Sequence, residues 1–114
     1  MFYAGDYFHV LSQNLPREQV IKLFDLFVNG TLVIAEEPSL KTEDGLTHCY
    51  FPKMTGLNKS ERTILKMNAV KTFKIDIKPS VYRSIYRCFF TSIILHESIH
   101  VLNLLDPQLG KRCL

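Results

Sequence analysis

Two histidines one helical turn apart, with a glutamate between them, are the residues of this sequence best placed to do chemistry. Residues 96–100 read HESIH, which is the pattern HExxH. Residues four apart lie on one face of a helix, so the imidazoles of His96 and His100 can bind one zinc ion. Glu97 lies about 100° around the helix from His96, where its carboxylate can take a proton from a metal-activated water molecule. The spacing predicts a zinc-dependent hydrolase with Glu97 as its general base.

The motif continues downstream as HExxHxxNxxD, which adds Asn103 and Asp106. Over residues 96–106 the sequence resembles the metzincin clan of zinc peptidases, whose motif is HExxHxxGxxH, with aspartate in place of the last histidine in some members. The resemblance implies that Asp106 is the third zinc ligand and that Asn103 stands at the turn where the helix ends. Asparagine suits such a turn because it adopts the left-handed conformation more readily than most residues. No methionine follows Asp106, so the methionine turn of that clan has no counterpart here.

Other interpretations of the same residues remain open. His96 and His100 continue an apolar stripe that is formed by Tyr82, Ile85, Tyr86, Phe89 and Ile93. They can therefore also be ordinary half-buried histidines, with Glu97 exposed to solvent. If Asp106 is not a ligand, His9 or His48 is an alternative third one.

Six segments have the pattern of a helix or a strand. Helices are expected at 16–28, at 58–70 and from residue 81 through the HExxH motif, and strands at 31–35, 46–51 and 71–78. Asn58 and Glu61 have the spacing of a capping box at the start of the second helix. These elements predict a single α+β domain over residues 1–114, in which a small, mostly antiparallel sheet packs against two or three helices and the C-terminal helix is long.

The strands differ in how clearly they are marked. In residues 71–78, Phe73, Ile75 and Ile77 alternate with polar side chains, which indicates one buried and one solvated face. The segments 31–35 and 46–51 are expected to form a hairpin with a long loop. In zincins an edge strand aligns the peptide substrate, and segment 71–78 takes that place in the resemblance.

Composition and charge restrict the setting of the protein. The chain has 114 residues, is 46% hydrophobic, and has three cysteines, an odd number with no CxxC pair. These features predict a folded domain in a reducing, cytoplasmic compartment. The N-terminus lacks the pattern of a secretory signal. The uncharged stretches are no longer than ten residues, far shorter than a membrane span, so no membrane partner is expected.

The charge is unevenly distributed. Residues 1–52 carry three basic and seven acidic side chains, whereas residues 53–87, from Lys53 to Arg87, carry nine basic and two acidic ones. Such a segment can contact nucleic acid phosphates, or can be a solvated face. A further possibility is that the protein is an interaction module without enzymatic activity. Such a module could be a viral or regulatory protein, and could self-associate as a homodimer.

Overall fold

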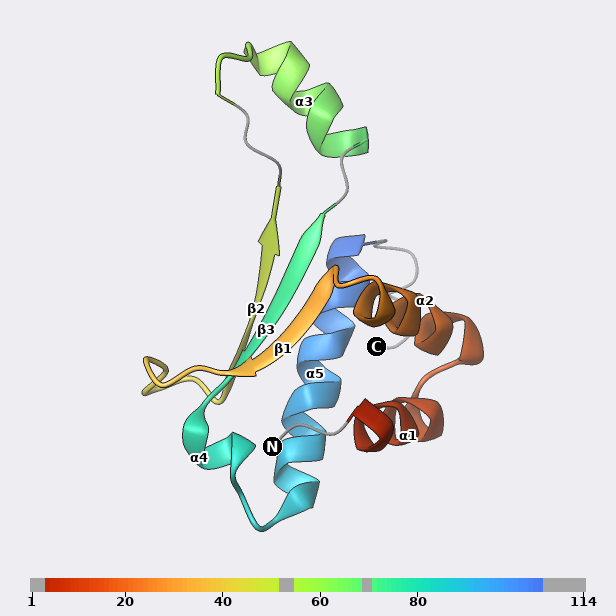
Figure 1. Ribbon diagram of the computed structural model, residues 1–114, viewed down its shortest axis with the longest axis vertical. Coiled ribbons are helices and arrows are strands. Elements are labelled where there is room, and N and C mark those ends of the chain that lie inside the picture. The colour runs from red at the N-terminus through yellow and green to blue at the C-terminus, as the bar shows by residue number, and fades with distance from the viewer. Residues whose placement is uncertain (1–3, 52–54, 69–70, 106–114) are drawn as a thin grey trace.

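The computed structural model describes residues 4–51, 55–68 and 71–105 (Figure 1). Its helices and strands are α1 Ala4–Asn14, α2 Arg17–Val28, β1 Leu32–Glu36, β2 Gly45–Tyr50, α3 Lys59–Asn68, β3 Thr72–Ile77, α4 Pro79–Tyr82 and α5 Arg87–Leu105. Within these residues the protein has a three-stranded mixed sheet and five helices, of which the C-terminal α5 is the longest. The predicted α+β class with a long C-terminal helix is confirmed.

The sheet has the strand order β1-β3-β2, with β3 parallel to β1 and antiparallel to β2. The predicted hairpin of the first two strands is therefore wrong, because β3 lies between them. The edge position expected for segment 71–78 is also wrong, since β3 is the central strand. The fully buried side chains of Phe73, Ile75 and Ile77 explain the central position, which buries an apolar strand more completely than an edge does.

One face of the sheet is covered by helix α5, which packs against β2 and β3 (Figure 1). Helix α2 packs against β1, and α1 packs against both α2 and α5. The core between these layers is formed by buried apolar side chains of the helices and the sheet: Tyr7, Leu11, Leu15, Leu23, Leu32, Phe73, Ile75, Ile77, Val81, Phe90, Ile94, Val101 and Leu102. The core thus holds α5 firmly along the sheet.

The chain between α4 and α5 departs from the predicted continuous helix. Helix α4 ends at Tyr82, and the hydroxyl of Ser84 accepts a hydrogen bond from the backbone N–H of Tyr86 at 3.1 Å. A serine that bonds the nearby backbone in this way competes with helix formation. Ile85 and Tyr86, expected on the apolar stripe, are consequently among the most exposed apolar side chains.

Helix α3 begins with the predicted capping box. The side chain of Asn58 accepts a hydrogen bond from the Glu61 N–H at 2.8 Å, and the Glu61 carboxylate accepts one from the Asn58 N–H at 3.3 Å. The helix lies beyond the ends of β2 and β3, away from the other helices (Figure 1). It therefore contributes little to the core that positions α5.

Helix α5 is the one helix within the described residues that is long and apolar enough to cross a membrane, by length and composition alone. A third of this stretch is buried inside the molecule, and the core helix of a soluble protein can have the same properties. The expectation that the protein has no membrane partner therefore stays a prediction.

Candidate functional site

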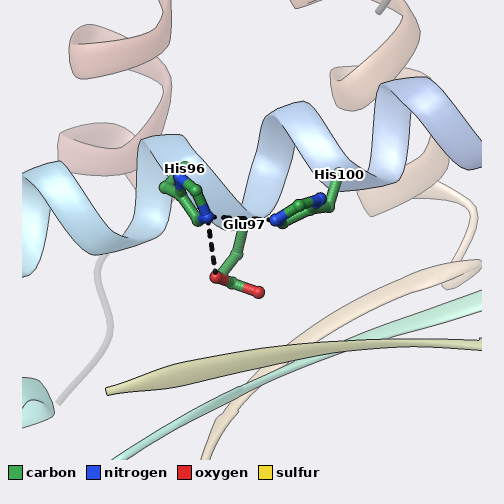
Figure 2. A group of neighbouring side chains, drawn as sticks. All are labelled: His96, Glu97 and His100. Carbon is green, nitrogen blue, oxygen red and sulfur yellow. Dashed lines mark hydrogen bonds and ion pairs between the residues drawn. The ribbon is translucent and has the colours of Figure 1, made fainter. Parts of the chain in front are cut away.

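The side chains of His96, Glu97 and His100 come together on one turn of α5 (Figure 2). The Nε2 atoms of the two imidazoles are 3.0 Å apart, and the rings meet nearly at right angles. Oε2 of Glu97 lies 3.9 Å from Nε2 of His96. One potential ligand atom from each residue lies within 4.8 Å of the others, so the three side chains could hold one metal ion.

The geometry of the two imidazoles fits zinc. With Zn–N bonds of about 2.05 Å and tetrahedral angles, two nitrogen ligands stand about 3.3 Å apart. The observed 3.0 Å separation of the Nε2 atoms of His96 and His100 is close to this value. Small rotations of two exposed rings would accommodate the ion. Imidazole and carboxylate are also the donor types that zinc takes in catalytic sites.

The exposure of the three side chains is the reverse of the alternative in which the histidines are half-buried and Glu97 is exposed to solvent. The side chain of His96 is 67% exposed and His100 is also exposed, whereas the side chain of Glu97 is 8% exposed. Glu97 points from α5 towards the sheet (Figure 2). Its Oε1 accepts a hydrogen bond of 2.8 Å from the hydroxyl of Thr47 on β2. A buried carboxylate needs such a partner, because it has lost its hydration.

The close approach of α5 to β2 depends on Gly45. A methyl group at this position would lie 2.9 Å from Cγ2 of Ile93 and 3.1 Å from Cγ of Glu97. Because glycine has no such group, the first residue of β2 can lie directly against the helix. This contact brings Thr47, two residues further along the strand, within reach of Glu97.

A hollow of about 390 Å³ opens at the motif, between α5 and the start of β2. It is lined by Gly45, Leu46, Thr47, His96, Glu97, His100, Asn103 and Leu104. The two imidazoles therefore lie at a concave surface with room for part of a substrate.

The opposite side of the motif is fixed to the core. Ser98 is fully buried, and its hydroxyl donates a hydrogen bond of 2.7 Å to the carbonyl of Ile94. Because the single hydroxyl proton of Ser98 is used there, the phenol of Tyr7 on α1 is the donor in its 2.9 Å hydrogen bond with Ser98. Burial raises the pKa of Tyr7 to about 12, an effect that the hydrogen bond with Ser98 partly offsets. This contact fixes the rotation of α5 about its own axis and hence the direction of the histidines.

The other residues proposed from the sequence lie elsewhere. Asn103 lines the hollow, but it lies inside α5, which continues to Leu105; the turn expected at Asn103 is therefore wrong. Asp106 lies outside the described residues. Nε2 of His48 bonds to Asp76 at 2.8 Å on the sheet face turned away from α5, and His9 borders a different hollow between α1 and α5. Neither histidine joins the motif.

Two residues of the site, Gly45 and Thr47, were not identified from the sequence. They belong to a strand fifty residues before the motif, and neither residue type indicates metal chemistry. The dipeptide Asp44-Gly45 indicates a turn, which is the only local signal there.

The basic segment is divided among several elements. Lys74 lies 3.1 Å from the carboxylate of Asp76, and Arg83 pairs with Glu36 at 2.8 Å. Lys59 and Arg62 lie exposed on α3. Nucleic-acid binding by this segment stays a prediction.

No family model matches this chain, and neither the curated proteins nor the solved structures contain a significant match. What supports metal chemistry is thus the grouping of His96, Glu97 and His100 itself.

Proposed function

We propose that the protein is a zinc-dependent hydrolase of the metzincin kind that cleaves peptide bonds. The observation that carries the proposal is the pair of imidazole nitrogens 3.0 Å apart beside a buried carboxylate, at the wall of an open hollow. A zinc ion held by His96 and His100 would supply Lewis acidity for polarising a carbonyl and acidifying a water molecule. Asp106 is a candidate for the third ligand.

Glu97 acts as the general base in this proposal. One carboxylate oxygen is bonded to Thr47, while the other lies 3.9 Å from His96 Nε2 and is available for a proton. Glu97 takes this proton from the attacking water and passes it to the leaving amine. The small dielectric response around a mostly buried carboxylate strengthens its interaction with a nearby cation.

The open edge of β2 supports a peptide as the substrate. In an antiparallel pair, the N–H and C=O groups of successive residues point alternately to the partner strand and away from it. The Lys78 N–H donates a hydrogen bond to the Asp44 carbonyl, so the backbone groups of Asp44 point to β3. Gly45 and Thr47 thus direct their N–H and C=O groups towards the open edge, and both line the hollow. An extended peptide added to β2 would lie beside the two histidines.

The test is metal analysis combined with turnover of a quenched fluorescent peptide library. We expect one zinc ion per chain in the wild type, and its loss in His96→Ala and His100→Ala. Glu97→Gln should keep the zinc and lose at least about a hundredfold in kcat, because general base catalysis contributes roughly 10²–10⁴-fold. Absence of stoichiometric zinc, or equal turnover by Glu97→Gln, would refute the proposal.

A second candidate function is self-association as an interaction module. Ile21, Phe24 and Val28 follow the spacing i, i+3, i+7 on α2 and are 47%, 49% and 66% exposed. Such a stripe on a surface helix is suited to packing against the same stripe of a second copy. Light scattering after gel filtration distinguishes a monomer from a dimer. A wild-type mass of twice 13.2 kDa, together with a mass of 13.2 kDa for Phe24→Ser, supports a dimer. A monomeric wild type rules it out.

A further inference from the structure

The buried carboxylate of Glu97 is held from the sheet rather than from its own helix. Oγ1 of Thr47 lies 2.8 Å from Oε1 of Glu97 and 3.2 Å from the backbone carbonyl oxygen of the same residue. The hydroxyl has one proton for these two acceptors, and the shorter contact goes to the charged one. Thr47 therefore anchors one specific oxygen of the glutamate.

The anchor leaves the other oxygen farther from Nε2 of His96 than two ligand atoms of one zinc ion stand from each other. Two ligand atoms on one tetrahedral zinc ion stand about 3.3 Å apart. Oε2 of Glu97 is 3.9 Å from Nε2 of His96, whereas the two histidine nitrogens are 3.0 Å apart. Without the bond to Thr47, rotation about the glutamate side chain would bring this oxygen into the coordination sphere.

We infer that Thr47 is a positioning residue that keeps Glu97 a proton acceptor and prevents it from becoming a metal ligand. The inference rests on the proposed function, since it assigns how the base of that site is held. Gly45 contributes by letting β2 lie close enough to α5 for this contact. A methyl group at position 45 would lie only 3.1 Å from Cγ of Glu97.

The experiment compares Thr47→Val, which removes the hydroxyl and nearly keeps the shape, with Thr47→Ser, which keeps the hydroxyl. Thr72→Val is the matched control, because Thr72 lies exposed on the neighbouring strand. Each protein is loaded with Co²⁺ in place of zinc, and its visible absorption spectrum is recorded, which reports the number of ligands on the ion. Unfolding temperatures establish that each variant is folded.

In Thr47→Val we expect a weaker Co²⁺ absorption, typical of an added ligand, together with a fall of 10- to 100-fold in kcat and little change in KM. That range is the usual effect of losing a residue that orients an active-site group. Thr47→Ser and Thr72→Val should behave as the wild type.

Two outcomes would overturn the inference: a wild-type spectrum in Thr47→Val, or the same defects in Thr47→Ser as in Thr47→Val. If the wild type binds Co²⁺ without turnover, peptide hydrolysis fails as the function, and the spectra alone decide the role of Thr47. If the wild type binds no metal, both proposals fall.

Discussion

Gly45→Ala is the substitution that most directly tests the packing of the motif against the sheet. The added methyl group would lie 2.9 Å from Cγ2 of Ile93 and 3.1 Å from Cγ of Glu97, both closer than ordinary van der Waals contact. Neither neighbour moves easily, because a β-branched isoleucine in a helix has essentially one χ1 rotamer and Glu97 is tied to Thr47. Helix α5 must therefore shift away from β2.

The expected cost of this overpacking is about 1–3 kcal/mol. An unfolding entropy of about 2.1 cal/mol/K per residue gives roughly 0.24 kcal/mol/K for 114 residues, so the Tm should fall by about 4–12 °C. Calorimetry measures this fall. The Co²⁺ absorption of Gly45→Ala should weaken as in Thr47→Val, because the shift separates Thr47 from Glu97.

Gly5→Ala is the control for the glycine substitution itself. No atom lies within 4 Å of a methyl group at Gly5 in α1, so alanine there should leave the protein at least as stable as the wild type. If Gly45→Ala matched Gly5→Ala in Tm and the wild type in its Co²⁺ spectrum, the close contact between α5 and β2 would be refuted as the basis of the site.

Three other predictions concern stability. Zinc at a hundred times its Kd should raise the Tm by about 11 °C, which corresponds to about 2.7 kcal/mol, and His100→Ala should abolish the rise in a thermal shift assay. The pKa of Tyr7 is about 12 in the folded state against 10 when unfolded. As the pH rises from 10 to 12, the free energy of unfolding of the wild type should therefore fall by up to about 2.7 kcal/mol relative to that of Tyr7→Phe. Denaturant titrations that gave parallel pH curves for the two proteins would contradict this. Asp76→Ala should lower the free energy of unfolding by about 1–3 kcal/mol, because the buried Asp76 carboxylate pairs with His48 and Lys74. Glu36→Ala breaks a pair with the exposed Arg83 and should cost less than about 1 kcal/mol. Equal urea midpoints for the two variants would refute the distinction.

The local elements were largely predictable from the sequence. The period of apolar residues placed α2, the capping box of Asn58 and Glu61 placed α3, and strict alternation placed β3. These signals work because they depend on neighbours within one or two turns. The order of the strands was predicted wrongly, since pairing depends on how completely Phe73, Ile75 and Ile77 are buried by distant helices.

The helix around the site shows the limit of periodicity. Stepping by three and four from Tyr82 assigned Ile85 and Tyr86 to the buried stripe and made the histidines its continuation. In the structure the helix starts again at Arg87, and its buried face passes through Ile94, Glu97 and Ser98. Because α5 is apolar on most of its surface, the sequence does not mark which face is buried.

The HExxH spacing by itself determined that two imidazoles and a carboxylate share one helical turn, because helix geometry alone places residues 96, 97 and 100 there. Only the tertiary structure decided which of them is exposed and what holds the carboxylate. The packing of α5 on β2 turns the histidines to solvent and buries Glu97 against Thr47, a contact between residues fifty positions apart that no local pattern encodes.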